Sequence, residues 1–341
     1  MKKVYILLFV SLILFFPSKS FAENYNIEKI FYLPQFNAVR GVESLNKNWQ
    51  KIDILAPQYH ILNTNLTITG NFGPKLKKAI KDYEIRVMPL VANANFNQKI
   101  IHNLLTSKTS QDKVINYLIK GALSNGYIGW QFDFENISYK DRDLYTAFVQ
   151  GAYSSFQKNK LLLSVVVVPR STDYENTNAF KNWSGVYDYK KLAESSDFIS
   201  LMAYDDPNSV GPVASVDFVN KGLDYIKDKV PAEKLSLGVP LYYWKWNADT
   251  NKKLGSGLFK NVSTIMANFS HVISFDQGLG VSCLSYSYDK KNYKVWFEDK
   301  QSLEAKIDII KDNNLRGFSA WLLGGEDPAI WTILDKKSPT S

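Results

Sequence analysis

The sequence contains few of the residues that bind metals or form covalent cross-links. Cys283 is the only cysteine, and the three histidines, His60, His102 and His271, are scattered along the chain. A single cysteine excludes an intramolecular disulfide framework and a cysteine metal site. The histidines lack the spacing of a zinc site. We therefore expect no metal, no cofactor and ordinary surface or core roles for the histidines.

Long apolar runs are also scarce, and the one that is present lies at the N-terminus. The run from Val4 to Phe16 follows two lysines and precedes P-S-K-S-F-A, which ends at Ala22. It is shorter than the roughly 20 apolar residues of a membrane-spanning helix, and its composition predicts a signal peptide over residues 1–22. We expect cleavage after Ala22, a secreted or periplasmic mature chain and no stable membrane insertion afterwards. An uncleaved anchor is the alternative.

A concentrated basic patch is absent too. The formal net charge is +8, and loss of Lys2, Lys3 and Lys19 with the signal peptide would leave about +5 (8 − 3). This charge is spread along the chain, which argues against nucleic-acid binding. With 45% hydrophobic and 22% charged residues the composition is that of a globular protein, and we expect a monomer. Aromatic residues make up 14% of the chain, a surplus that allows for stacking on sugar rings.

What the chain does contain is an alternation of apolar, β-branched-rich runs with amphipathic helical stretches. Eight such runs predict strands, at residues 27–35, 52–59, 84–93, 127–136, 161–169, 197–205, 235–243 and 317–323. The helical stretches between them are 74–83, 110–125, 140–158, 188–195, 213–229 and 302–313, with a last helix starting at Asp327-Pro328. This order predicts an α/β protein, an eight-stranded parallel (β/α)8 TIM barrel. A doubly wound open sheet is the competing architecture.

The rhythm breaks at about residues 244–298, where short alternating runs such as V-S-C-L-S-Y-S-Y (281–288) replace the β-α pattern. We interpret this segment as a small β-rich insertion between the seventh strand and its helix. Long insertions of this kind are more often functional than idle. Residues 23–341 then form one catalytic barrel that contains this inserted subdomain.

The fourth predicted strand carries an unexpected row of polar groups, G-W-Q-F-D-F-E-N (129–136). Because side chains alternate along a strand, Gln131, Asp133 and Glu135 should point into the barrel and the aromatics between them to the helices. A parallel barrel strand has no solvent face, so an acidic row there needs another explanation. Two neighbouring carboxylates repel, so one should hold a proton near neutrality, as acid-catalysed glycosidic cleavage requires.

Other reactive or aromatic side chains lie where the remaining strands should end. In such barrels the active site is built at the carboxyl ends of the strands. The candidates there are Asn93, Met202, Tyr204, Asp205, Tyr242 and Trp321. These candidates would place carboxylates, phenols and indoles together at the carboxyl-end opening of the barrel.

These motifs together resemble family 18 of the glycoside hydrolases. The family pattern D-x-x-D-x-D-x-E falls on Ile128, Gln131, Asp133 and Glu135, of which only the last two match. L-M-A-Y-D (201–205) and K-L-S-L-G-V-P-L-Y (234–242) resemble the sixth- and seventh-strand segments of the family. W-S-G-V-Y-D-Y (183–189), G-P-V-A-S (211–215), V-W-F-E-D (295–299) and L-G-G-E-D-P-A-I-W (323–331) are most similar to the branch that hydrolyses spore-cortex peptidoglycan.

The resemblance implies a role for each matching residue. Glu135 would be the general acid and later the base, and the substrate's own 2-acetamido oxygen would be the nucleophile, with net retention. Asp133 would orient that acetamido group, and Tyr204 would donate a hydrogen bond to its carbonyl. The remaining candidates, Gln131, Met202, Asp205, Trp321, Asn93 and Tyr242, would bind substrate, with Trp321 as the apolar floor.

Two departures from the family pattern carry expectations of their own. Gln131 replaces an acid, and we expect its amide to hydrogen-bond Asp133 without accepting a proton from it. Ile128 replaces the outer acid, and we expect it to pack. The implied partner is an N-acetylglucosamine-containing polysaccharide, in chitin, peptidoglycan or an N-linked glycan, with endo and exo action both open. A non-catalytic carbohydrate-binding protein on the same barrel is the alternative, although lectin-like members of the family usually lack the acid that Glu135 supplies.

Overall fold

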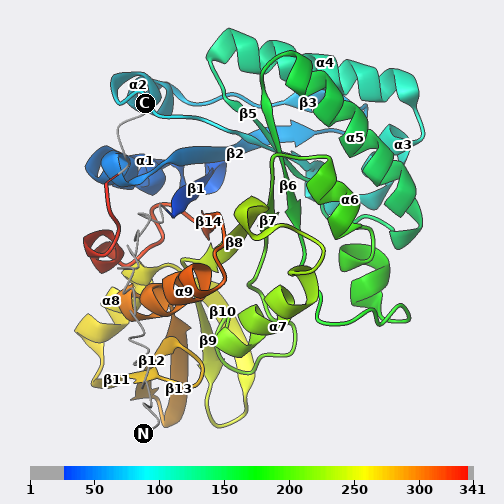
Figure 1. The fold of residues 1–341 in the computed structure, drawn as a ribbon. Helices are drawn as coiled ribbons and strands as arrows, with labels where there is room; N and C mark the ends of the chain where they lie inside the picture. Colours follow the sequence, from blue (N-terminus) through cyan, green and yellow to red (C-terminus); the bar gives the residue numbers. More distant parts are fainter. Residues whose placement is uncertain (1–26, 337–341) are drawn as a thin grey trace, which may run out of the picture.

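The computed structural model describes residues 27–336, and in it a parallel sheet closes into a barrel (Figure 1). Its strands follow the spatial order β1-β14-β8-β7-β6-β5-β4-β2, and β2 pairs with β1 to complete the ring. The barrel strands are β1 (Glu28–Pro34), β2 (Ile54–Leu62), β4 (Leu90–Asn93), β5 (Gly129–Asp133), β6 (Leu162–Val167), β7 (Phe198–Leu201), β8 (Leu235–Pro240) and β14 (Gly317–Trp321). The predicted eight-stranded TIM barrel is confirmed. A short strand, β3 (Ile68–Thr69), pairs antiparallel with β2.

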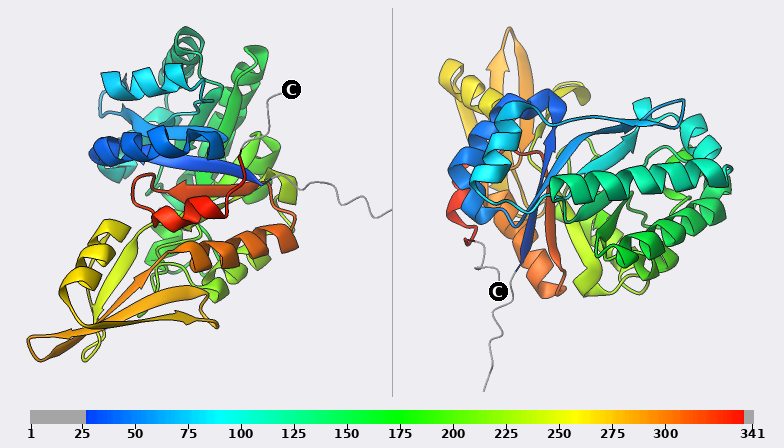
Figure 2. Two further views of the ribbon diagram at one scale, coloured as in Figure 1. Left: turned by 90° about the vertical axis from the view of Figure 1, so that its left-hand side faces the viewer. Right: turned by 90° about the horizontal axis from the view of Figure 1, so that it is seen from above.

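Helices surround the barrel, as Figure 2 shows from above. They are α1 (Ala38–Asn48), α2 (Pro74–Asp82), α3 (Gln98–Leu105), α4 (Lys108–Asn125), α5 (Arg142–Lys158), α6 (Tyr189–Glu194), α7 (Val216–Ile226) and α9 (Lys300–Asp312). Local capping fixes their ends: Ser107 accepts a hydrogen bond from the Ser110 N–H at the start of α4, and Gly126 ends that helix in the left-handed conformation (φ 68°). The predicted last helix is a short 3₁₀ segment, Pro328–Thr332.

The main core lies between strands and helices, and β5 shows how it forms. The indole of Trp130 donates to the Leu118 carbonyl of α4 (2.8 Å), and Phe132 stacks on Phe148 of α5 with 5.5 Å between ring centroids. The aromatics of β5 therefore face the helices, as the alternation predicts. A second, smaller core fills the barrel itself, and the half-buried Ile128 packs there, which confirms its predicted packing role.

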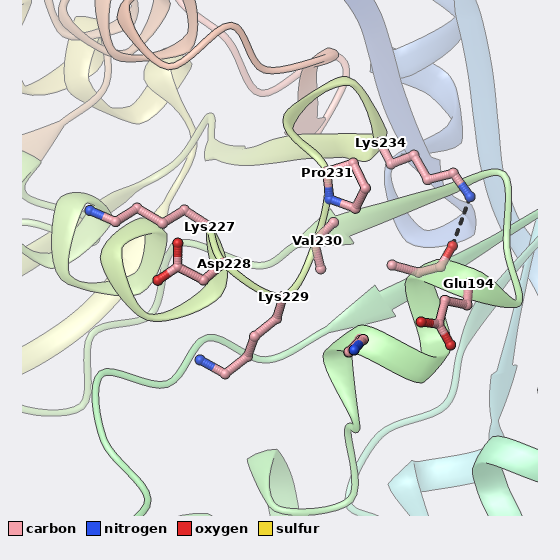
Figure 3. A pocket seen from close by; sticks show the side chains of 9 residues that line it. Glu194, Lys227, Asp228, Lys229, Val230, Pro231 and Lys234 are labelled. Carbon is pink, nitrogen blue, oxygen red and sulfur yellow. Dashed lines mark hydrogen bonds between the residues drawn. The ribbon is translucent and has the colours of Figure 1, made fainter.

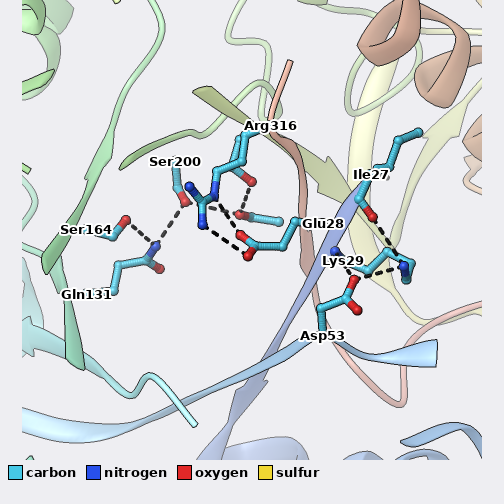
Figure 4. Close-up of polar contacts among 10 residues, drawn as sticks. Ile27, Glu28, Lys29, Asp53, Gln131, Ser164, Ser200 and Arg316 are labelled. Atoms are coloured by element: carbon cyan, nitrogen blue, oxygen red, sulfur yellow. Dashed lines mark hydrogen bonds and ion pairs between the residues drawn. The ribbon is translucent and has the colours of Figure 1, made fainter. Parts of the chain in front are cut away.

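Ion pairs fasten the amino ends of three barrel strands to one another (Figure 4). Arg316, the residue before β14, forms an ion pair with Glu28 of β1 (2.7 Å), and Lys29 of β1 forms one with Asp53, the residue before β2 (2.8 Å). Lys29 is almost fully buried, so this pair lies in the barrel wall rather than on the surface. These contacts cross-link the seam where the first and last strands of the barrel meet.

The segment after β8 forms a separate antiparallel sheet that projects from the barrel (Figure 2, left). Its spatial order is β10-β9-β13-β12-β11, and the strands are β9 (Tyr243–Asn247), β10 (Lys252–Gly257), β11 (His271–Asp276), β12 (Val281–Tyr288) and β13 (Lys291–Phe297). The predicted β-rich insertion is thus present in the structure. It also contains a helix that the sequence pattern did not predict, α8 (Phe259–Asn268).

In the part of the chain that the structure describes, no helix is both long and apolar enough to cross a membrane. The predicted signal peptide, residues 1–22, lies outside the described residues.

Candidate active site

The site is built around the carboxyl end of β5. Gln131 and Asp133 are buried, at 1% and 4% exposure, whereas Glu135 is half-buried and lies just beyond the last strand residue, Asp133. The Gln131 amide donates to Ser164 of β6 (2.8 Å) and Ser200 of β7 (2.9 Å), inside the barrel (Figure 4). Gln131 and Asp133 therefore point inward, as predicted.

The predicted hydrogen bond from Gln131 to Asp133 was wrong. Both N–H groups of Gln131 are donated to serine hydroxyls instead, one to Ser164, which lies beside Gln131 in the register of β5 and β6, and one to Ser200. Asp133 instead accepts a hydrogen bond at Oδ2 from the amide of Gln58 on β2 (3.1 Å). Burial raises the pKa of the Asp133 carboxyl, and the Gln58 hydrogen bond lowers it by a smaller amount.

The backbone of Glu135 is held on both sides by the buried side chain of Asn93, the last residue of β4. Asn93 Nδ2 donates to the Glu135 carbonyl, and Asn93 Oδ1 accepts from the Glu135 N–H, each at 3.0 Å. Burial raises the pKa of the Glu135 carboxyl, and the negative charges of Asp133 and Asp205 raise it further. Both effects favour the protonated form of Glu135. In the structure the amide of Asn93 bonds the backbone of Glu135. The substrate contact expected of Asn93 remains a prediction.

The segment after β7 places a phenol and an acid beside this carboxyl. β7 ends at Leu201, earlier than predicted, so Tyr204 and Asp205 lie on the loop that follows, with Asp205 in the left-handed region (φ 59°). Tyr242, just after β8, donates to Asp205 Oδ1 (2.7 Å), and its ring meets that of Tyr204 edge-on. Burial and nearby carboxylates raise the pKa of Tyr204 well above its usual value, so its hydroxyl stays a donor. Met202 is half-buried at the start of the loop.

Trp321 ends β14 and forms the opposite side of the mouth. Its indole is half-buried, packs against Tyr32 of β1 (5.9 Å between centroids) and lies 6.5 Å from the ring of Phe36. The Asn37 amide donates to the Leu323 carbonyl (2.8 Å), which ties the segment after Trp321 to the start of α1. Phe36 is 77% exposed. Neither it nor Gln58 belongs to a motif, so sequence reasoning missed both.

No cluster of His, Cys, Asp and Glu in the described residues 27–336 has the arrangement of a metal site. His60 is buried against Trp130 and Phe72, His102 pairs with Asp141 (3.1 Å), and His271 is exposed. Burial lowers the pKa of His60 to about 4. The predicted structural roles of these histidines fit their surroundings.

A hollow of about 370 Å³ lies elsewhere, beside the connections that lead into β7 and β8 (Figure 3). Its lining includes Glu194 and several lysines, of which Lys234 donates to the carbonyls of Ala193 (2.8 Å) and Ser196 (2.9 Å) and so closes the end of α6. Since it adjoins the amino ends of these strands, it lies at the end of the barrel opposite Asp133 and Glu135, where contacts serve stability.

Comparison with known proteins gives a consistent match. Residues 21–326 match the model of the glycosyl hydrolases family 18. The chain is 25% identical over 303 residues to the uncharacterized glycosylase YvbX of Bacillus subtilis, covering 86% of this chain and 87% of the relative. It is 28% identical over 249 residues to the cortical fragment-lytic enzyme of B. subtilis, where the match covers 71% of this chain and 57% of that enzyme.

Solved structures show the same fold. The spore cortex-lytic enzyme SleL of Bacillus megaterium superposes with a TM-score of 0.80 at 24% identity, over 91% of this chain and 73% of SleL. A chitinase of Chromobacterium violaceum superposes with a TM-score of 0.79, also at 24% identity, over 90% of this chain and 97% of the chitinase.

Proposed function

The chain belongs to glycosyl hydrolase family 18 and is a glycoside hydrolase, and from this premise we propose that it cleaves β-1,4-linked N-acetylglucosamine polymers by substrate-assisted, retaining catalysis. The observation that carries the proposal is the pair at the end of β5. A half-buried Glu135 lies beside a buried Asp133, and the environment of Glu135 favours its protonated form.

Glu135 has the properties of a general acid. Its backbone is fixed by Asn93, so the carboxyl is presented in a defined place at the mouth. It would protonate the glycosidic oxygen as the bond from that oxygen to the anomeric carbon breaks. A water would later attack, and the Glu135 carboxylate would take up its proton.

The nucleophile in this scheme comes from the substrate. The carbonyl oxygen of the 2-acetamido group would bond to the anomeric carbon as the leaving group departs, giving an oxazolinium ion. Asp133 would orient the acetamido N–H and stabilise the positive charge, and the Tyr204 hydroxyl would donate to the acetamido oxygen. Attack by water from the side of the departed group then gives the β-product.

Aromatic faces at the mouth support a sugar substrate. Trp321 offers an indole between Tyr32 and the exposed ring of Phe36, and Tyr242 and Asp205 close the other side. We propose that Trp321 forms the floor beneath the sugar that reacts. The relatives named for spore cortex and for chitin both act on chains that contain N-acetylglucosamine, and the proposal covers this shared chemistry.

Turnover of fluorogenic N-acetylglucosamine oligomers tests the proposal. We expect the wild type to release the fluorophore and Glu135→Gln to be slower by about a hundred- to ten-thousand-fold, the range of general acid catalysis. Glu233→Gln is the matched control, because Glu233 is exposed on the turn before β8, and it should match the wild type. Tight binding without turnover in both wild type and Glu135→Gln would favour a carbohydrate-binding protein instead.

The class of polymer is resolved by incubating the protein with chitin oligomers, purified peptidoglycan and N-linked glycopeptides and identifying the reducing end released. We also propose that the chain is secreted after loss of residues 1–22. Sequencing the N-terminus of the exported protein should then give Glu23 as the first residue.

A further inference from the structure

Strand β2, which is separated from β5 and Asp133 only by β4, contains an irregularity near its carboxyl end. Gln58 pairs with Leu90 of β4, but the next pair is His60 with Val91, so Tyr59 is an extra residue in β2. The rings of Tyr59 and His60 both contact Phe72 on the outer side of the barrel, although neighbouring strand residues normally face opposite ways. A bulge of this kind re-aims side chains and is common beside active sites.

The side chain of Gln58 points into the barrel, where its Nε2 reaches Asp133 Oδ2 (3.1 Å). No side chain of β5 itself donates a hydrogen bond to Asp133 in the described residues. The two N–H groups of Gln131 are both donated to serines, and its remaining atom, Oε1, is an acceptor without a partner in the described part of the chain. An acceptor oxygen cannot stabilise a carboxylate. Gln58 is therefore the amide that donates to the ionised form of Asp133.

We propose that Gln58 is a positioning residue of the active site, which favours the ionised form of Asp133 and fixes its orientation by donating to Oδ2, in place of the acid that Gln131 replaces. The proposal rests on the proposed function, because it assigns Asp133 a role in the reaction. The two glutamines thus have different roles. Gln131 donates to the serines inside the barrel, and Gln58 donates to the Asp133 carboxylate.

Among the described groups around Asp133, Gln58 alone donates a hydrogen bond to its carboxylate. Those close enough to interact electrostatically are Glu135 on the same segment and four phenols, Tyr32 from β1, Tyr145 from α5, Tyr187 from the segment before α6 and Tyr204 from the loop after β7. The pKa of each phenol is raised by burial, so none carries a charge at neutral pH. No lysine or arginine is among these groups. Glu135 is repelled by an ionised Asp133, which keeps the proton on Glu135.

The consequence is a defined dependence on pH. A hydrogen bond donated to a carboxylate favours its ionised form, so losing it should raise the pKa of Asp133. If the reaction needs Asp133 ionised, the acidic limb of the kcat/KM profile moves to higher pH by about one unit in Gln58→Leu, the size expected for one bond to a charged group. The alkaline limb stays in place, because Asp133 is still ionised there and still repels Glu135.

A second variant gives a rescue that packing alone would not produce. In Gln58→Glu a protonated carboxyl can donate to Asp133 as the amide does, so the variant should approach wild-type kcat/KM at acidic pH. Once the new carboxyl ionises it repels Asp133, and a new loss of activity should appear as the pH rises. The control is Gln157→Leu, which removes a second glutamine–aspartate contact, to Asp197, at the other end of the barrel (3.3 Å). Its profile should superimpose on that of the wild type.

The experiment measures kcat/KM against pH on a fluorogenic N-acetylglucosamine oligomer for the wild type and the three variants. It is paired with a titration of the ¹³C-labelled Asp133 carboxyl by NMR, which reads the contact without turnover. A higher Asp133 pKa in Gln58→Leu supports the assignment even if the wild type hydrolyses nothing, a result that would overturn the proposed function alone. An unchanged Asp133 titration in Gln58→Leu, or an equal change in Gln157→Leu, would overturn the role of Gln58.

Discussion

Asn93→Leu tests how far the reaction depends on the placement of Glu135. Asn93 is 2% exposed and makes two hydrogen bonds to the Glu135 backbone, with a third, longer one (3.4 Å) from its Nδ2 to the Asn97 carbonyl. Leucine has nearly the same volume and fills the same space, but it offers no donor or acceptor. The substitution therefore removes the attachment of Glu135 without emptying the site.

The expected size follows from the bonds that are lost. Two net hydrogen bonds are worth about 2 kcal/mol of unfolding free energy, and leaving the Glu135 N–H and carbonyl without partners brings the total to roughly 2–4 kcal/mol. A shift of the general acid by about 1 Å costs on the order of a hundredfold in rate. We expect kcat to fall by about ten- to a hundredfold and KM to change little, because the sugar contacts proposed for Trp321 and Tyr204 remain.

Steady-state kinetics on the fluorogenic oligomer and urea unfolding measure the two effects separately. Asn97→Leu is the control, because its side chain caps α3 by accepting from the Lys99 N–H (2.9 Å) and does not touch Glu135. It should cost about 1 kcal/mol of stability and leave kcat unchanged. Lost stability with unchanged kcat in Asn93→Leu would refute the positioning argument.

Three further predictions concern single side chains. Tyr204→Phe should lower kcat by about a hundred- to a thousandfold, because it removes one donor placed at the reacting group; equal kcat values would contradict this role. Gln131→Asp should shift the acidic limb of the pH–rate profile, since it puts an ionisable group beneath Asp133, and a superimposable profile would contradict it. His60 is neutral when buried, with its pKa lowered from 6.5 to about 4, so its contribution to stability is full above pH 6.5 and is lost as the pH falls toward 4. The loss of unfolding free energy approaches about 3 kcal/mol. Urea unfolding of His60→Phe should show no such loss over the same pH range.

The barrel was predictable because its signal is repeated eight times. Each predicted strand after the first is a short apolar run followed by an amphipathic helical stretch, and neither small errors in the ends nor the missed helices α1 and α3 changed the order of the strands. The predicted carboxyl ends of the strands were less accurate. β7 stops at Leu201 and β5 at Asp133, so Tyr204, Asp205 and Glu135 lie on loops that were assigned to strands. Helix α8 was missed because the alternating runs around it dominated the pattern of the insertion.

The site was predictable only where a motif marked it. Asp133 and Glu135 stood out because acids in a buried parallel strand are unusual. Gln58 had no such signal, because alternation from Ile54 and Ala56 turns it into the barrel but does not reveal that its amide meets Asp133. The partner of Gln131 was also wrong for a spatial reason. Strict alternation along β5 says nothing of the serines that β6 and β7 bring beside it.

The stereochemistry of hydrolysis tests the central claim most directly. Proton NMR of the first product formed from an N-acetylglucosamine oligomer, recorded before mutarotation, distinguishes the two anomers. Our account predicts the β-anomer from the wild type, and no hydrolysis of the matching glucose oligomer, which lacks the acetamido nucleophile. An α-anomer as the first product, or equal rates on the two oligomers, would contradict it.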